Sequence, residues 1–240
     1  MSVLNYYLLG SGAAEATPGY ILYVDPSNIN SFNPDQSVST VFDLVDENNF
    51  IYYQNNVNYS NNYVIFDPNS VDYGLLYITP SILDLSYRDF TIEILLWNSQ
   101  LEYNPIIMNG DIATSALDWG IFISAGNLVF STSKNNFTPK GVSLSSYTVY
   151  HICFVYDSSV GNFGCYINNI YYSIYRSQGS PITTNLSNSE PNGTLGAISK
   201  SYPTIASTFG GGIGTIRLYD KPLTADEVSN NYNIEILKTL

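Results

Sequence analysis

Short runs of hydrophobic, aromatic and β-branched residues alternate with turn residues along almost the whole chain. Val, Ile, Tyr, Phe and Trp favour strands, whereas Asn, Ser, Gly, Pro and Asp favour the turns between them. About a dozen strands joined in this way predict an antiparallel two-sheet sandwich rather than alternating βαβ units. The runs that we interpret as strands span residues 20–24, 63–66, 73–78, 90–97, 119–124, 127–132, 148–156, 163–167, 170–175 and 212–219.

Three turns and one helix complete this pattern. Ala125-Gly126 and Asn168-Asn169 predict tight hairpins, because Gly and Asn tolerate the positive φ that primed turns need. Residues 157–162 predict a longer turn between two antiparallel arms. Near the carboxyl end, Thr224 and Glu227 have the spacing of a capping box and predict a short helical turn.

The 240 residues contain no linker, repeat or change of composition that would divide the sandwich. One all-β domain commonly reaches about 200–250 residues, so we assign residues 19–240 to a single domain. Residues 1–18 precede the first predicted strand and form an N-terminal arm or anchor, or a free tail. They lack the basic region of a secretory signal, and we expect any export to use another route.

Four stretches resemble the laminin-G-like, concanavalin-A-like domains of secreted adhesins and of phage and large-virus virion proteins. Two of them are specific. Val149-Tyr-His-Ile-Cys-Phe-Val-Tyr-Asp157 resembles the family's WHHVAFVYDG, and Gly214-Thr-Ile-Arg-Leu-Tyr-Asp-Lys-Pro-Leu-Thr-Ala-Asp-Glu-Val228 resembles its IGEVRIYNRALSADEI. The other two are residues 20–44 and 63–97. The resemblance implies a jelly-roll sandwich, in which Ile216 and Leu218 face the core and Arg217 has an architectural role.

The charge balance narrows the range of partners. The chain has 8 Lys plus Arg against 20 Asp plus Glu, for a net charge of -12. This balance opposes binding to nucleic acid and to anionic lipid. No run approaches the ~18 apolar residues that span a bilayer, so we expect no membrane insertion.

Catalysis is not expected. Retaining hydrolases of this fold carry two or three acids on alternate positions of one strand, in an ExDxxE pattern that this chain lacks. Asp89 and Glu93 come nearest, but Asp89 precedes the strand and Glu93 belongs to the Phe-Thr-Ile-Glu framework of non-catalytic relatives. The single histidine, His151, is interpreted as a packed, hydrogen-bonded strand residue rather than a base or ligand.

Ligand-binding candidates are loop residues with oxygen or aromatic side chains. Asp111 and Asp118 flank a loop before Trp119, and laminin-G-like domains often hold calcium on the rim of the sandwich through such oxygens. We expect no required cofactor, with calcium as an option. Cys153 and Cys165 lie on two arms of one hairpin, where they form either a disulfide or two separate buried thiols.

Two functions fit these observations. The first is a non-enzymatic structural, decoration or fibre protein of a virion, with capsid proteins as partners and assembly into a homo-oligomer. The second is a carbohydrate-binding adhesin or receptor-binding module at a cell surface, with a surface glycan as partner. Loops that supply Tyr, Trp119, Asn and Asp support the second function, because sugar sites combine an aromatic face with amide and carboxylate groups.

Overall fold

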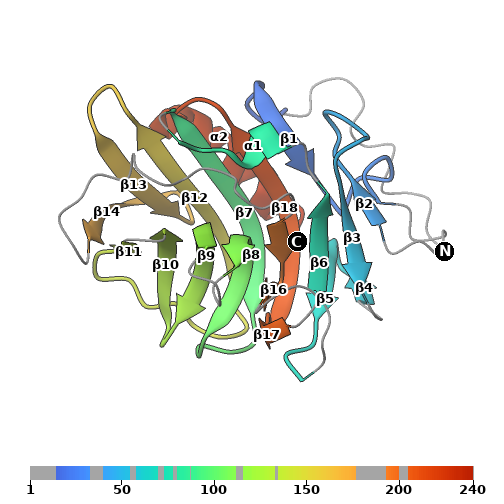
Figure 1. The fold of residues 1–240 in the computed structure, drawn as a ribbon. Coiled ribbons are helices and arrows are strands. Elements are labelled where there is room, and N and C mark those ends of the chain that lie inside the picture. The colour runs from blue at the N-terminus through green and yellow to red at the C-terminus, as the bar shows by residue number, and fades with distance from the viewer. Residues whose placement is uncertain are drawn as a thin grey trace.

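A computed structural model describes residues 15–32, 40–54, 58–69, 73–77, 80–86, 88–111, 116–132, 135–176, 193–199 and 205–239. Within these residues the chain forms two facing antiparallel sheets with one longer helix on the outside (Figure 1). The predicted all-β, antiparallel, two-sheet sandwich is confirmed.

The first sheet, here the helix-side sheet, is the one that α2 covers. Its strands follow the spatial order β4, β5, β18, β7, β12 and β13, and β1 also pairs with β18. Their bounds are β1 Tyr20–Val24, β4 Asn58–Ser60, β5 Tyr63–Phe66, β7 Phe90–Asn98, β12 Val149–Asp157, β13 Asn162–Ile167 and β18 Gly211–Tyr219.

The second sheet, here the far sheet, follows the order β2, β3, β6, β15, β8, β9, β10 and β11. Its bounds are β2 Thr40–Phe42, β3 Phe50–Gln54, β6 Tyr73–Tyr77, β8 Asn104–Asp111, β9 Ala116–Ser124, β10 Asn127–Thr132, β11 Asn136–Pro139 and β15 Gly193–Leu195.

One strand joins the two sheets: β14, Ile170–Arg176, pairs with β13 on one side and β11 on the other. The remaining elements are a small hairpin and two helices, with bounds β16 Ala197–Ser199, β17 Ile205–Thr208, α1 Pro80–Leu83 and α2 Ala225–Leu237. Among the described residues, no helix has the length and apolar character needed to cross a bilayer.

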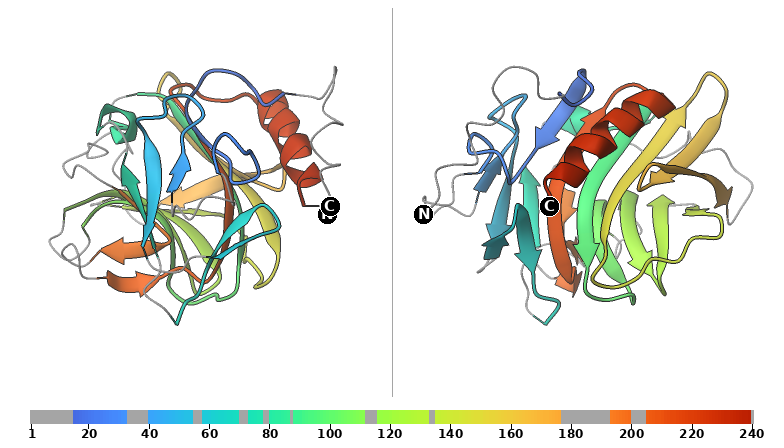
Figure 2. Two further views of the ribbon diagram at one scale, coloured as in Figure 1. Left: turned by 90° about the vertical axis from the view of Figure 1, so that its right-hand side faces the viewer. Right: turned by 180° about the vertical axis from the view of Figure 1, so that it is seen from behind.

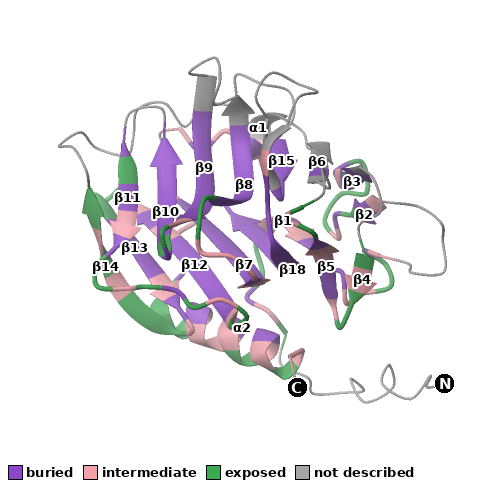
Figure 3. Ribbon diagram, turned by 90° about the horizontal axis from the view of Figure 1, so that it is seen from below, coloured by how far each residue is buried: buried purple, intermediate pink, exposed green. Residues whose placement is uncertain are grey.

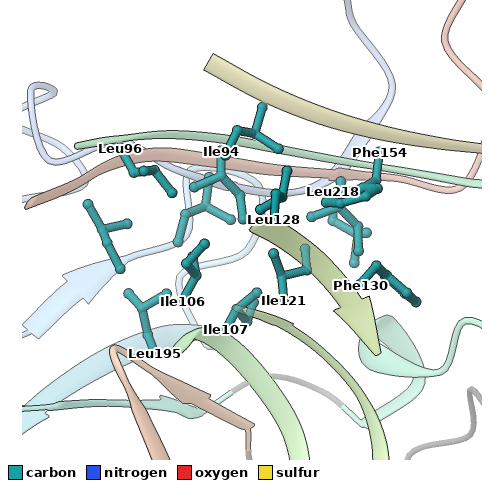
Figure 4. Packing of buried hydrophobic residues seen from close by; sticks show 14 of the residues in the cluster. Ile94, Leu96, Ile106, Ile107, Ile121, Leu128, Phe130, Phe154, Leu195 and Leu218 are labelled. Carbon is teal, nitrogen blue, oxygen red and sulfur yellow. The ribbon is translucent and has the colours of Figure 1, made fainter. Parts of the chain in front are cut away.

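The core lies between the sheets because side chains alternate along each strand. On β7, Ile92, Ile94 and Leu96 belong to the core, so Glu93 and Trp97 point to the outer face. Residues of both sheets meet in the middle (Figure 4). On β18, Ile216 and Leu218 are core residues, as predicted.

The predicted turns form as expected. Ala125 and Gly126 have φ of 48° and 76°, and Asn168 and Asn169 have φ of 48° and 63°. Two successive positive φ values match the right-handed twist of the flanking strands. The longer turn also closes a hairpin, since Asp157 pairs with Asn162.

The carboxyl-terminal helix is longer than predicted. Both reciprocal bonds of the capping box between Thr224 and Glu227 are present, but α2 continues for 13 residues instead of one turn. Its buried residues are Val228, Asn231 and Glu235. Two of the three are polar, so no hydrophobic periodicity in the sequence marked this length. Figure 3 shows buried, half-buried and exposed residues along α2, as expected for a helix with one face on a sheet.

The two cysteines are separate, buried thiols. Cys153 pairs with Tyr166, and Cys165 pairs with Phe154. The two side chains therefore point to opposite faces of the sheet: Cys165 belongs to the core and Cys153 to the cluster beneath α2. Burial raises the pKa of both thiols well above the usual value. Of the two alternatives, the structure has the separate thiols and not the disulfide.

Part of the predicted N-terminal arm lies on α2. The backbone N–H of Thr17 donates to Asn231 Oδ1 at 2.7 Å, and Asn230 Nδ2 donates to the carbonyl of Glu15 at 2.9 Å. Residues 1–14 of the arm lie outside the described residues, so the boundary at residue 18 stays a prediction.

Candidate functional site

The outer face of the helix-side sheet has two halves. α2 crosses one half of β18, β7 and β12 and leaves the other half uncovered (Figure 2). We call these the covered half and the open half. Glu93, His151 and Arg217 lie in the covered half, whereas Trp97 and Val149 lie in the open half.

Arg217 is the centre of the covered half and is fully buried. Its guanidinium donates to Glu93 Oε1 at 3.1 Å and also pairs with Glu235 of α2. The same group lies over the Tyr23 ring, 4.6 Å from its centroid. Arg217 was expected to be architectural, and it joins the sheet to the helix.

Glu93 collects donors from three elements. His151 Nε2 lies 2.6 Å from Glu93 Oε1, and Asn231 Nδ2 donates to Oε2 at 2.9 Å. His151 is therefore a packed, hydrogen-bonded strand residue, as predicted. Two buried nitrogen atoms here, Nε of Arg217 and Nδ1 of His151, have no hydrogen-bond partner.

Lys238 closes the network at the end of α2. Its ammonium donates to Asp25 Oδ2 at 2.7 Å, to Thr215 Oγ1 at 3.0 Å and to Glu235 Oε1 at 3.0 Å. An ammonium group has three N–H donors, so all three are used.

Pairing decides the charge state of these groups. Burial alone would raise the pKa of Glu93, but the Arg217 guanidinium and the His151 contact outweigh it and lower that pKa to about 2. Burial would lower the pKa of Lys238, but Glu235 and Asp25 raise it above the usual value. Both side chains are thus charged at neutral pH.

The covered half is closed to ligands. The side chains of Glu93 and His151 are each 1% exposed, and those of Arg217 and Glu235 are 0% exposed. A substrate cannot reach these carboxylates, so the acid nearest to a hydrolase pattern is a structural ion-pair partner. This network fastens α2 to the sheet.

The open half contains a groove of about 780 Å³ beside the end of α2. Its volume falls within the roughly 300–1,000 Å³ of small-molecule sites. It is lined by Ser60, Asn61, Asn62, Tyr63, Ile65, Trp97, Val149, Lys238 and Thr239. A smaller groove of about 430 Å³ lies near Asp43, and that carboxylate already accepts bonds from Tyr23, Val45 and Asn49.

One lining residue of the groove, Trp97, belongs to an aromatic pair. The rings of Trp97 and Tyr147 stack with centroids 6.3 Å apart and planes 24° apart, and Tyr147 is 76% exposed. Gly212 makes room for the indole, because a Cβ at that position would lie 2.2 Å from Trp97 Nε1. The small residue on β18 lets Trp97 lie close to the sheet.

Neutral polar residues line the groove together with Trp97. Asn61 and Asn62 have φ of 50° and 70° in the turn between β4 and β5. Asn62 Nδ2 donates to the carbonyl of Lys238 at 3.0 Å, which ties this turn to the end of α2. The hydroxyl of Tyr63 is buried without a hydrogen-bond partner. Burial, with the charge of Glu235 adding, raises the pKa of Tyr63 to about 12, so the hydroxyl keeps its proton.

The predicted ligand candidates lie elsewhere. Trp119 lies in β9, in agreement with the predicted strand 119–124, but it is a core residue, 1% exposed, whose Nε1 donates to the carbonyl of Leu83 at 2.9 Å, so its side chain does not extend from a loop toward a ligand. Asp118 is a buried residue of the same strand. Asp111 ends β8, and its side chain lies outside the described residues.

No group of three or more His, Cys, Asp or Glu that could hold a metal occurs among the described residues. Calcium at Asp111 and Asp118 stays a prediction.

Sequence reasoning missed the groove because its residues come from distant segments. Trp97 could have been found from the sequence. Residues 92, 94 and 96 of its strand are core residues, so the alternation puts the large ring of Trp97 on the outer face. Tyr63 and Lys238 gave no comparable signal, because only the fold brings β5 to the end of α2.

Comparison with known proteins identifies the family. A family profile described as the concanavalin A-like lectin/glucanases superfamily, Laminin_G_3, matches residues 76–229. This chain belongs to that family. A search of curated protein sequences gave no match.

Solved structures share the fold at low identity. One is botulinum neurotoxin type C, which depends on two ganglioside molecules for entering cells: 17% identity, TM-score 0.65, covering 91% of this chain and 51% of that chain. A botulinum neurotoxin serotype D binding domain has 16% identity and TM-score 0.63, covering 91% and 52%. A Trypanosoma rangeli sialidase has 13% identity and TM-score 0.64, covering 95% and 34%. This chain spans about half or less of those chains.

Proposed function

We propose that this family member is a non-catalytic carbohydrate-binding module whose glycan lies in the open groove. The supporting observation is Trp97, which lines the groove with the neutral polar residues Asn61 and Tyr63 and stacks on the exposed ring of Tyr147. A sugar ring has apolar C–H faces and a rim of hydroxyls. Aromatic faces suit the former, and amide and phenol groups suit the latter.

The build of the groove favours recognition over catalysis. Trp97 lies on β7 against Gly212 of β18, and Asn62 is tied to Lys238, so rigid elements hold the binding groups. Rigid groups lose little entropy on binding. The nearby carboxylates of Glu235 and Asp25 are engaged by Lys238 and do not face a ligand as free acids.

The structural neighbours support the same proposal. A neurotoxin that depends on gangliosides and a sialidase that binds a sugar derivative both share this fold. A cell-surface or extracellular glycan is therefore the partner we propose for this chain. The module works at a surface where such glycans are exposed, and it requires no cofactor for this role.

Glycan-array binding of the purified chain tests the proposal. Wild-type protein is expected to bind a subset of oligosaccharides, with and without added calcium. Tyr147→Ala is expected to reduce that binding about tenfold, because it removes an exposed ring worth roughly 1.4 kcal/mol. Tyr175→Ala is the matched control, since Tyr175 is 60% exposed but lies on β14 and not against Trp97 as Tyr147 does. Absence of any binder, or equal loss in both variants, contradicts the proposal.

A second candidate function is a decoration or fibre protein of a virion, bound to capsid proteins and assembled as a homo-oligomer. Its supporting observation is that residues 15–17 are fastened to α2, so an anchor carried by residues 1–14 would start from a defined place on the domain. A variant lacking residues 1–14 is expected to be missing from purified particles by mass spectrometry, whereas the full chain is present at many copies. Normal incorporation of the variant contradicts the anchoring role.

A further inference from the structure

We infer that the groove selects neutral glycans and disfavours sialylated or otherwise anionic ones. This inference rests on the proposed function and adds the class of sugar that the site takes. It departs from the structural neighbours, which are a ganglioside-dependent toxin and a sialidase. Three features of the described residues carry it: the saturation of Lys238, the charge balance beneath the groove and the neutral character of the free polar groups.

Lys238 is the cation that lines the groove. Its three N–H donors are directed to Asp25, Thr215 and Glu235 at 2.7–3.0 Å. The side chain is 18% exposed, and two of its three acceptors are carboxylates. To bind a ligand carboxylate, Lys238 would have to give up one of these three hydrogen bonds, two of which are charge-assisted, and that loss offsets the gain from the new contact. The ammonium group of Lys238 therefore lines the groove but has no N–H donor left for a ligand.

The surrounding charges give no compensating attraction. The network holds three carboxylates, of Asp25, Glu93 and Glu235, against two cations, Arg217 and Lys238. His151 adds at most one positive charge, so the network has no positive excess while its three carboxylates are ionised. The whole chain carries a net charge of -12. An anionic sugar would meet a neutral or negative potential on approach and in the groove.

The polar groups that remain free are neutral. Asn61 is exposed and makes no hydrogen bond within the described residues, and the Tyr63 hydroxyl is buried without a partner. Tyr63 keeps its proton at neutral pH because its pKa is raised to about 12. An amide and a phenol both donate and accept hydrogen bonds, as sugar hydroxyls do. These groups match a hydroxyl-bearing ring better than a carboxylate.

The test compares matched oligosaccharides that differ by one sialic acid. Neutral galactose-, glucose-, mannose- and N-acetylglucosamine-terminated oligosaccharides are placed on one array with the sialylated counterpart of each galactose-terminated member. Lactose and 3′-sialyllactose are then titrated in solution by ligand-observed NMR. We expect neutral members to bind and sialylated counterparts to bind about tenfold more weakly, because the carboxylate loses hydration that no free cation replaces.

A pair of charge variants assigns the preference to the network. Asp25→Asn removes one negative charge beside Lys238 and keeps the side-chain shape. The gap in affinity between neutral and sialylated oligosaccharides is therefore expected to narrow several-fold. Glu47→Gln changes the net charge of the chain equally at an exposed residue outside the groove and is expected to leave the gap unchanged. Thermal unfolding of both variants confirms that they are folded before binding is compared.

The outcomes separate the two proposals. Binding of sialylated members as strongly as their neutral counterparts, or more strongly, overturns the neutral-sugar inference and leaves the carbohydrate-binding function standing. Binding of no member, neutral or sialylated, overturns both. A gap that Asp25→Asn does not narrow, or that Glu47→Gln narrows equally, overturns the role of the network in that preference.

Discussion

β7, β12 and β18 each contribute to both halves of the outer face of the helix-side sheet, yet the two halves differ in chemistry. In the covered half, Glu93 and Arg217 are buried and paired beneath α2. In the open half, a few residues along the same strands, Trp97 packs over Gly212 and lines a groove. Charged side chains occupy the half that is sealed, and neutral ones, apart from Lys238 at the end of α2, occupy the half that is open.

The difference follows from the cost of burying charge. An ion taken out of water costs several kcal/mol unless partners surround it, so a buried network persists only when its charges are paired. The charged groups of such a network already have partners and so have few hydrogen-bonding positions left for a ligand. An open groove has the opposite requirement, since its groups must exchange water for a ligand and regain water when the ligand leaves. Shifted pKa values of charged groups therefore mark the contacts that fasten α2 to the sheet, while the aromatic ring of Trp97 marks the proposed binding groove.

The largest expected effect comes from breaking the covered half. Arg217→Met leaves Glu93 and Glu235 buried without their shared cation and is expected to cost about 3–5 kcal/mol in the free energy of unfolding. Urea unfolding at neutral pH measures it. Arg176→Met makes the same replacement at an exposed residue of β14 and is expected to change stability by less than about 0.5 kcal/mol. Equal effects of the two variants would mean that the network contributes nothing to the fastening of α2.

The next effect is acid sensitivity. The pKa of Glu93 is about 2 in the folded chain against a usual 4.5, so the unfolded state binds more protons between these values. The stability that this carboxylate supplies is complete above pH 4.5 and is lost as the pH falls toward 2, by roughly 3 kcal/mol.

Unfolding free energies measured at pH 5, 4, 3 and 2 test this expectation. Glu93→Gln should flatten the dependence over this window, because the amide does not titrate there. Glu47→Gln, at an exposed residue, should keep the slope of the wild type. A slope unchanged in Glu93→Gln would show that other acids cause it.

A smaller effect is expected from filling the space between Gly212 and the Trp97 indole in the open half. Gly212→Ala places a Cβ 2.2 Å from the present position of Trp97 Nε1, so the indole must move. We expect this to cost about 1–3 kcal/mol in the free energy of unfolding. Gly214→Ala is the graded control, since its nearest contacts are at 3.3 Å. Tryptophan fluorescence reports the change, because the other tryptophan, Trp119, is in the core. Glycan affinity should fall in the first variant much more than in the second.

The smallest expected effect tests whether the open half depends on the start of α2. Thr224→Ala removes the N-cap of α2 and is expected to cost about 1 kcal/mol. Thr148→Ala, at an exposed residue before β12, serves as the control in thermal unfolding. Glycan affinity should stay the same in the Thr224 variant, since the cap lies at the opposite end of α2 from Lys238. A loss of affinity would mean that the groove depends on the whole helix.

Local patterns in the sequence were enough for most of the architecture. The alternation along 90–97, the paired Asn168-Asn169 and the spacing of Thr224 and Glu227 act through near neighbours on the chain, and each formed as predicted. The same patterns did not reveal the length of α2, because its buried face includes Asn231 and Glu235. They also did not reveal that Trp119, expected as a ligand contact, has its indole buried inside the sandwich, where Nε1 donates to the carbonyl of Leu83.

The site depended on contacts that no local pattern contains. Lys238 meets Asp25 across 213 positions of the chain, and Arg217 meets Glu93 across 124. Turn chemistry and side-chain alternation are properties of a few adjacent residues and can be read along the chain. Whether a charged residue is paired or free depends on which strands become neighbours and on where α2 comes to rest. For that reason the sequence alone indicated a sandwich with binding chemistry, and tertiary packing decided that the charges would be sealed and the aromatic groove left open.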